Sequence, residues 1–244
     1  MKQGYFTIKE KTELVSGIMR MRLTGDTSAF TAPGQFLNIK LDSLYLRRPI
    51  SLCDLDGDTM TIIYKVVGRG TYALAAMQAG EQLDILTGLG NGYDLTEGMK
   101  PILLGGGVGV PPLYYLARKL IAKGCEVTAV LGFNKKEEVF YENEFKALGV
   151  KTIVATADGS YGVKGFVTDA MADVDYDYFY TCGPEPMLRA VYKAAKSSGQ
   201  MSFEKRMGCG FGACMGCSCK TITGYKRICK EGPVMRKEEI LWED

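Results

Sequence analysis

Residues 101–112 read PILLGGGVGVPP, and this stretch decides the fold expected for the middle of the chain. Its first residues form an apolar run typical of a buried strand, the glycines follow at once, and an amphipathic helical pattern continues to about Lys123. A strand, a glycine loop and a helix in this order present backbone N–H groups to a pyrophosphate, although the loop is not a strict G-x-G-x-x-G. The two prolines stand at the helix start, where a missing N–H does no harm. The predicted cofactor-binding residues of this loop are Gly105, Gly106, Gly107 and Gly109.

Downstream, apolar strands alternate with helical patterns. Strands are expected at 126–133, 151–155 and 176–181, and helices at 141–148, 166–172 and 184–197. Continuously apolar strands between helices indicate a parallel sheet covered on both faces, whose ligands bind at the carboxyl ends of the strands. Cys182 and Gly183 stand at such an end and are candidate nucleotide-facing residues, and the alternative for Cys182 is a small buried core residue.

Upstream, residues 5–86 are rich in short alternating patterns. Strands are expected at 5–8, 18–23, 36–39, 50–52 and 60–67, separated by Gly, Asp and Pro turns, which indicates a small antiparallel barrel. Gly70 permits close approach at the start of an apolar helical stretch, Thr71 can cap that helix, and its free N–H groups can hold a phosphate. Arg48 would add a charged partner. The alternative is an ordinary helix cap beside an ordinary edge strand.

Cysteines gather near the C-terminus. Three are spaced C-x4-C-x2-C and a fourth follows at a distance, which is the plant-type spacing of thiolates around a [2Fe–2S] cluster. Glycines at 208, 210 and 212 let such a loop curl with its N–H groups turned toward the sulfurs. A four-cysteine zinc site is the alternative, but structural zinc usually shows two C-x2-C-like pairs. The candidate metal ligands are Cys209, Cys214, Cys217 and Cys229, with Cys219 as a surplus thiol.

Composition narrows the class of protein. The chain has 244 residues, 46% of them hydrophobic, and a formal net charge of +2, which gives no support to nucleic-acid binding. No run of about eighteen apolar residues and no signal-peptide core appear, so neither a membrane span nor export is predicted. Because the cysteines have metal-ligand spacing rather than a disulfide pattern, we expect a reducing, cytoplasmic location.

The sequence contains no histidine. A Rieske centre, a His-ligated zinc enzyme and a Ser-His-Asp triad are therefore excluded, and any chemistry must come from bound cofactors. The sequence accordingly predicts no catalytic side chain.

Three of these stretches resemble motifs of the ferredoxin reductase superfamily. The run from Arg48 to Ser51 resembles its flavin motif R-x-[YFI]-S, in which the Arg meets the FAD pyrophosphate and the Ser lies near the isoalloxazine. The glycine loop and the CGPEPM segment that begins at Cys182 resemble its two pyridine-nucleotide signatures. The resemblance implies FAD and NAD as cofactors, with NAD rather than NADP on family grounds alone. The residues that it implies for FAD are Arg48, Pro49, Ile50, Ser51, Ile63, Tyr64, Lys65, Gly70 and Thr71.

The whole chain resembles the electron-transfer subunits of NAD-dependent (type B) dihydroorotate dehydrogenases. The most specific pieces are EKRMGCGFGAC at 204–214 and YKRICKEGPV at 225–234. Phe211 stands where the family commonly has Ile or Leu, and Cys219 is an extra thiol. The resemblance implies an FAD-binding β-barrel domain at 1–98, an NAD-binding α/β domain at 99–200 and a [2Fe–2S] domain at 201–244.

The same resemblance implies a relay. A separate FMN-containing dihydroorotate dehydrogenase catalytic subunit would deliver electrons through [2Fe–2S] and FAD to NAD, in a heterotetramer of two subunits of each kind that serves pyrimidine biosynthesis. Two other functions stay open from the residues. One keeps the cofactors and changes the partner, as in the small flavin/iron–sulfur subunit of a ferredoxin:NADP transhydrogenase or a sulfide dehydrogenase. The other is a zinc-bearing binding module with a vestigial nucleotide fold.

Overall fold

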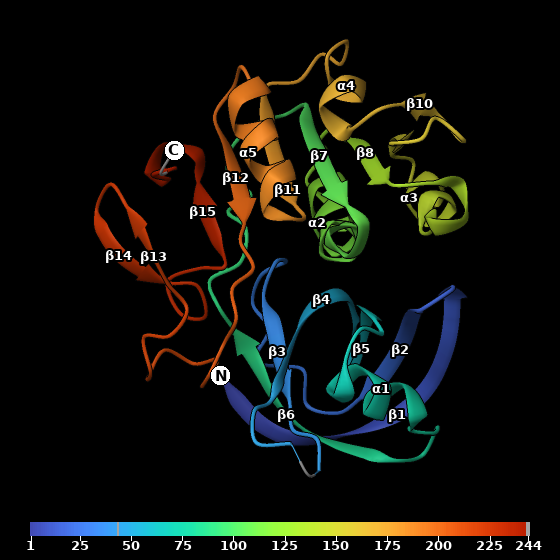
Figure 1. Cartoon of the computed structure of the whole chain (residues 1–244), viewed down its shortest axis with the longest axis vertical. Helices are drawn as coiled ribbons and strands as arrows, with labels where there is room; N and C mark the ends of the chain where they lie inside the picture. The colour runs from blue at the N-terminus through green and yellow to red at the C-terminus, as the bar shows by residue number, and fades with distance from the viewer. Residues whose placement is uncertain (43, 243–244) are drawn as a thin grey trace.

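The structure, a computed structural model, describes residues 1–42 and 44–242. Its N-terminal part is a closed barrel of six antiparallel strands in the order β1-β2-β5-β4-β3-β6 (Figure 1). The strands are β1 (Lys2–Val15), β2 (Ile18–Thr24), β3 (Phe36–Ile39), β4 (Arg48–Asp56), β5 (Thr59–Lys65) and β6 (Gln82–Leu89), with helix α1 (Arg69–Ala76) between β5 and β6. The predicted barrel is confirmed, and β6 is a strand that the sequence patterns did not delimit.

Alternation along the strands fills the barrel. On β3, Leu37 and Ile39 are fully buried in the barrel core. Phe36, the first residue of β3, packs instead into a hydrophobic cluster outside the barrel. Successive side chains of a strand point to opposite faces, so β3 has an inner face and an outer face. The outer face of β3 is turned toward the rest of the molecule.

The middle of the chain forms six strands of a seven-stranded sheet in the order β10-β9-β8-β7-β11-β12-β15, in which β15 (Val234–Arg236) comes from the C-terminal part (Figure 1). Its elements are β7 (Pro101–Gly106), α2 (Val110–Ala122), β8 (Thr128–Phe133), α3 (Glu142–Ala147), β9 (Lys151–Thr156), β10 (Val163–Lys164), α4 (Val167–Met171), β11 (Tyr178–Cys182), α5 (Glu185–Ala194) and β12 (Gly199–Ser202), with 3-10 turns η1 (Gly107–Gly109) and η2 (Lys136–Glu138). Six strands run parallel, and buried residues on both faces form two hydrophobic clusters, as the apolar runs predict.

The C-terminal part adds a two-stranded hairpin, β13 (Ser218–Thr221) and β14 (Gly224–Arg227), and then β15 (Val234–Arg236) and the 3-10 turn η3 (Lys237–Glu239). The sequence predicts a parallel sheet. The observed sheet is mixed, because β15 pairs antiparallel with β12. A strand that returns from a separate C-terminal segment can join an edge in either direction, because no helical crossover constrains it. The predicted domain boundaries remain a prediction. Nowhere in residues 1–42 and 44–242 does a helix combine the length and the apolar character that a membrane crossing requires.

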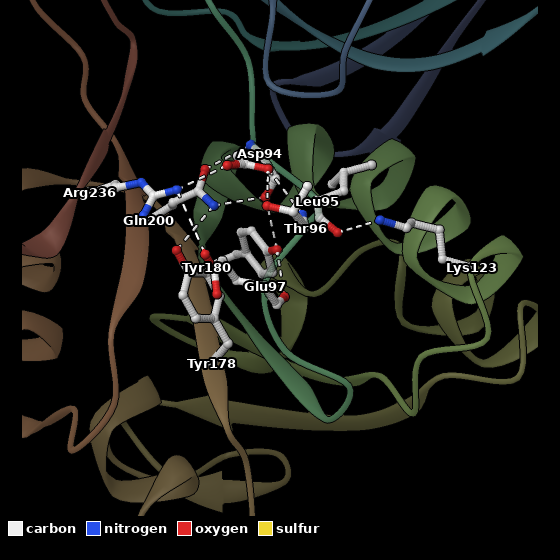
Figure 2. A network of polar contacts seen from close by, with 9 residues as sticks. All are labelled: Asp94, Leu95, Thr96, Glu97, Lys123, Tyr178, Tyr180, Gln200 and Arg236. Atoms are coloured by element: carbon white, nitrogen blue, oxygen red, sulfur yellow. Dashed lines mark hydrogen bonds and ion pairs between the residues drawn. The ribbon is translucent and has the colours of Figure 1, made fainter.

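The segment after β6 is fastened to the sheet by a polar network around Asp94 (Figure 2). The buried Gln200 on β12 accepts a hydrogen bond from the Asp94 N–H and donates to the Asp94 carbonyl, each at 2.8 Å. Arg236 on β15 donates to the Asp94 carboxylate at 3.0 Å, and the Tyr180 hydroxyl donates to the Asp94 carbonyl at 3.0 Å. The connection between barrel and sheet is therefore held by strands from three different parts of the chain.

We expect Gln200→Leu to lower the free energy of unfolding by about 2 kcal/mol, because both main-chain groups of Asp94 lose a partner in a buried position. Urea unfolding followed by circular dichroism measures the change. Gln78→Leu is the matched control, since Gln78 is exposed and its change should stay within about 0.5 kcal/mol. Equal losses in the two variants would show that the network adds nothing.

Candidate functional site

The glycine loop and the segment that begins at Cys182 lie side by side. β7 and β11 are neighbours, and Gly105 stands opposite Cys182 in their register. A methyl group on Gly109 would overlap the Cys182 carbonyl and would lie 2.7 Å from the Gly183 Cα. The two predicted pyridine-nucleotide segments, distant in sequence, thus meet at the carboxyl edge of the sheet, where ligands of such sheets bind.

Met187 completes this junction. A side chain on Gly106 would come within 2.6 Å of the Met187 sulfur, and one on Gly183 within 2.6 Å of its methyl carbon. Met187 stands in the first turn of α5, a helix that begins at Glu185 directly after Pro184. Both glycines therefore pack closely against the end of the Met187 side chain at this edge.

Cys182 is a neutral thiol here. Burial raises its pKa to about 12, against the opposing effect of a hydrogen bond with Ser202 on the neighbouring strand β12. A thiol so far from ionisation is a poor nucleophile at neutral pH. Cys182 can contact a ligand as a small apolar group, and it is unsuited to covalent chemistry.

The predicted flavin residues come from two elements that touch. Arg48 begins β4, and its side chain lies directly on Gly70 in the first turn of α1, so that a methyl group on Gly70 would overlap the guanidinium. Arg48 donates to the Leu46 carbonyl, an uncharged partner, so its positive charge remains available to a phosphate. The structure brings together the two residues that the sequence assigns to the pyrophosphate.

Thr71 is not the N-cap residue of α1, although its side chain takes part in the cap from inside the helix. The N-cap is Gly68 in extended conformation, and Thr71 is the third helical residue. Its hydroxyl accepts from the N–H groups of Val67 and Gly68 at 2.9 and 3.1 Å and donates to the Gly68 carbonyl at 3.0 Å. The helix starts earlier because this hydroxyl reaches back and satisfies the turn, as in a capping box. At this position only the backbone N–H of Thr71 is suited to a phosphate.

The stretch from Ile63 to Lys65 ends β5 beside β4, but its side chains diverge. Ile63 packs into a cluster shared with α2, and Tyr64 packs among the barrel core residues beside Leu74. Lys65 is exposed. A ligand along this strand would therefore meet the backbone and Lys65.

Buried polar atoms without partners provide a test of fit for FAD. Within the described residues, three buried side-chain atoms lack a hydrogen-bond partner: Asn38 Oδ1, Tyr64 Oη and Trp242 Nε1. Asn38 lies on the outer face of β3, which pairs with β4, whereas Tyr64 lies among the barrel core residues. An unpaired buried polar atom costs about 1–3 kcal/mol, and FAD carries donors and acceptors that can satisfy it. The residues around β4 fit this cofactor.

The four candidate metal ligands form two pairs. Cys209 and Cys214 hydrogen-bond through their side chains, and so do Cys217 and Cys229. The backbone repeats the pairing, because the Cys209 N–H donates to Cys214 Sγ at 3.5 Å and the Cys229 N–H donates to Cys217 Sγ at 3.4 Å. Across residues 1–42 and 44–242, no three Cys, Asp or Glu side chains converge on a point suited to one metal ion. Two pairs of cysteines are the ligand arrangement of a binuclear cluster, in which each iron takes two thiolates.

The backbone around the loop favours thiolate at Cys209. Burial opposes ionisation, but the N–H groups of Phe211, Cys214 and Ala213 outweigh it and lower the Cys209 pKa to about 6. Ala213 donates to this sulfur at 3.2 Å. A thiolate that accepts several N–H bonds is the form that binds iron. The expectation that the glycine loop turns its N–H groups toward the sulfurs therefore agrees with the geometry.

Cys229 lies deeper. Burial, the hydrogen bond with Cys217 and the nearby Cys217 and Cys209 raise its pKa to about 12. A bound metal cation would offset this cost of ionising Cys229. Cys219 lies on β13 outside the two pairs, and burial raises its pKa above the usual thiol value.

Sequence reasoning missed four residues that shape these sites: Asn38, Met187, Ser202 and Arg227. Asn38 and Arg227 hold the carbonyls of Cys209 and Gly212 respectively. A signal was available for Arg227, which stands inside the specific stretch at 225–234. No local pattern marks Asn38, which lies in the middle of an ordinary strand.

Known proteins match the chain along its whole length. Residues 204–241 match the family described as the iron-sulfur cluster binding domain of dihydroorotate dehydrogenase B, and residues 103–193 match the oxidoreductase NAD-binding domain. A relative from Shouchella clausii (strain KSM-K16) is 44% identical over 258 residues and covers 98% of each chain. A relative from Geobacillus sp. (strain WCH70) is 43% identical over 256 residues and covers 99% of each chain. Both are named dihydroorotate dehydrogenase B (NAD(+)), electron transfer subunit.

Solved structures share the fold. A chain from the structure of an NADH-dependent reduced ferredoxin-NADP oxidoreductase has a TM-score of 0.88 and 29% identity, over 97% of this chain and 90% of that one. The flavohem-like FAD/NAD binding domain of a nitric oxide dioxygenase from Vibrio cholerae has a TM-score of 0.69 and 22% identity, over 79% of this chain and 92% of that one.

The closed barrel, the nucleotide sheet and the cysteine loop define a ferredoxin reductase-like oxidoreductase with a C-terminal iron–sulfur domain. Within this class, the two relatives described above are more than 40% identical to this chain over at least 98% of both sequences. The chain belongs to the family of dihydroorotate dehydrogenase B (NAD(+)) electron transfer subunits.

Proposed function

We propose that this chain is the subunit that passes electrons from the FMN of a dihydroorotate dehydrogenase catalytic subunit through [2Fe–2S] and FAD to NAD, in pyrimidine biosynthesis. The observation that carries the proposal is 44% identity, over 98% of both chains, to a protein named as this electron transfer subunit. The paired cysteines and the flavin and nucleotide segments supply one site for each step.

The proposed roles follow from the placement of the residues. Arg48, with the N–H groups at the start of α1 around Gly70, binds the FAD pyrophosphate, and Ser51 stands further along β4 toward the isoalloxazine. The loop from Gly105 to Gly109 and the Cys182–Gly183 segment position the nicotinamide between them. When bound, the flavin exchanges a two-electron hydride with NAD and single electrons with the cluster, so it must lie between them.

The cysteine pairs are proposed to hold the cluster at the site where electrons enter the chain. Cys217 and Cys229 are each 2% exposed, whereas Cys214 is exposed and Phe211 is 45% exposed. One pair is thus buried toward the protein and the other lies near the surface. We propose a complex of two subunits of each kind. We also propose that it lies in the cytoplasm, where the eight free cysteines stay reduced.

A second candidate keeps the cofactors and changes the partner. The structural match to a chain of the NADH-dependent reduced ferredoxin-NADP oxidoreductase covers 97% of this chain. Its identity of 29% is well below the 44% of the dihydroorotate dehydrogenase relative, so we place this function second.

Protein purified without oxygen is expected to show flavin and iron–sulfur absorption together. Co-expressed with the FMN-containing subunit, it should support dihydroorotate-dependent reduction of NAD, which is measured by absorbance of NADH. A colourless sample with stoichiometric zinc would refute the redox function. A complex that reduces NAD only with reduced ferredoxin would instead support the second candidate.

A further inference from the structure

Asn38 occupies the outer face of β3, next to the flavin strand. It stands opposite Pro49 of β4 on one side and opposite Leu86 of β6 on the other, while Phe36 on the same face stands opposite Ser51. Residues directly opposite each other in an antiparallel pair point to the same face, with Cβ atoms about 4.5–5.5 Å apart. Asn38 therefore shares its face with Pro49 and Ser51 of the flavin motif.

The same side chain contacts the cysteine loop. Asn38 Nδ2 donates a hydrogen bond to the Cys209 carbonyl at 3.3 Å, and Asn38 is 1% exposed. Gly210 has a φ of 77°, and a methyl group at this position would overlap the Asn38 amide. Only glycine satisfies both the backbone angle and the contact. The first ligand of the cluster loop is thus seated on the barrel strand that pairs with the flavin strand.

Arg227 holds the other side of the loop. Its guanidinium donates to the Gly212 carbonyl and is itself held by Glu231. The Cys209 and Gly212 carbonyls are held by Asn38 and Arg227, and the N–H groups of Phe211, Ala213 and Cys214 turn toward the Cys209 sulfur. The loop conformation depends on one anchor from the barrel and one from the hairpin.

The remaining polar atom of Asn38 has no partner within the described residues. Asn38 Oδ1 is buried and accepts no hydrogen bond there. A buried acceptor in this situation is commonly satisfied by a bound group. The flavin ring and its ribityl chain both carry donors, and the flavin motif lies on the adjacent strand.

We propose that Asn38 is a positioning residue that joins the two redox sites: Nδ2 docks the cysteine loop against the barrel, and Oδ1 accepts a hydrogen bond from the bound flavin. The inference rests on the proposed function for the identity of the cofactors. The contact between Asn38 and the cysteine loop, in contrast, does not depend on which cofactors are bound.

Two variants separate the two halves of the proposal. Asn38→Leu removes the donor and the acceptor, whereas Asn38→Asp keeps an acceptor oxygen and removes the donor. Asn143→Leu and Asn143→Asp, on the exposed face of α3, are matched controls. The full-length protein is used as purified, and three quantities are compared: hydrogen exchange of residues 208–214, the dissociation constant of FAD, and the rate at which NADH reduces first the flavin and then the cluster.

Hydrogen exchange of residues 208–214 is expected to be about tenfold faster in both Asn38 variants, because one hydrogen bond to the loop is lost. The FAD dissociation constant is expected to rise about tenfold in Asn38→Leu and less than about threefold in Asn38→Asp. Cluster reduction should slow about tenfold in both variants, while flavin reduction at saturating FAD keeps the wild-type rate.

Unchanged exchange in both variants would overturn the docking role. An unchanged FAD dissociation constant in Asn38→Leu, or an equal rise in Asn38→Asp, would overturn the acceptor role. Equal slowing of flavin and cluster reduction would show general damage and overturn positioning. If the wild-type protein binds no FAD, the proposed function and the acceptor role both fail, and hydrogen exchange alone still decides the docking role.

Discussion

Cys214→Ser is expected to reduce electron transfer between this chain and the FMN-containing subunit to less than about 1% of the wild-type rate, while NADH still reduces bound FAD. Serine replaces a soft thiolate by a hydroxyl that is a poor ligand for an iron–sulfur cluster. Cys214 is exposed on the loop and is paired with Cys209, and it belongs to neither of the two nucleotide segments. The variant should therefore lose one half-reaction and keep the other.

Dihydroorotate-dependent NAD reduction and NADH-dependent flavin bleaching, measured on the same preparation, test this expectation. Cys219→Ser is the matched control, because Cys219 lies on β13 outside the two pairs and its loss should leave both activities within about twofold of wild type. Loss of both activities in Cys214→Ser would mean that the cysteine domain is structural. Loss of cluster absorbance in Cys219→Ser would mean that the ligand set is wrong.

Gly109→Ala is expected to slow hydride transfer from NADH to FAD by about a hundredfold. The added methyl group would overlap the Cys182 carbonyl and lie 2.7 Å from the Gly183 Cα, so one of the two nucleotide segments must move. A displacement of about 1 Å of a positioning group can cost a hundredfold in rate. FAD binding at Arg48 and Gly70, on the barrel, should be unaffected.

Stopped-flow reduction of the flavin by NADH, with FAD content measured by absorbance, gives the result. Gly4→Ala on β1 is the matched control, since its added methyl group would meet only Phe6 at 3.6 Å, an ordinary contact. Wild-type hydride transfer in Gly109→Ala would show that the nicotinamide does not depend on this junction. Loss of FAD from Gly109→Ala would show that the barrel and the sheet do not act independently.

Local motifs were predictable from the sequence because their geometry depends on neighbouring residues. The glycine loop after β7 and the start of α2 were placed correctly, and so was the order of barrel, sheet and cysteine segment. Such features follow from turn chemistry and hydrophobic periodicity within a few residues. Thr71 shows the limit of this reasoning, since a capping residue and a third helical residue look alike in one sequence.

The edge strands were harder to predict. β12 and β15 are short, and β15 joins the sheet only because the C-terminal segment returns to β12 and runs antiparallel to it. No periodicity marks a three- or four-residue strand, and its pairing depends on a partner far away in the chain. The seven-stranded sheet therefore draws on both the middle and the end of the chain.

The sequence by itself favoured a [2Fe–2S] cluster and a pyrophosphate-containing cofactor, because ligand spacing and glycine loops are local requirements of these groups, and the family resemblance implied FAD and NAD. Only the tertiary structure decided how the sites meet. Asn38 and Cys209, which hydrogen-bond at 3.3 Å, are separated by 171 residues, and Gly105 and Cys182 are register partners on strands far apart in sequence. Such contacts follow from the packing of whole elements rather than from any local preference, so the residue that seats the cluster loop next to the flavin strand carries no signal in the sequence.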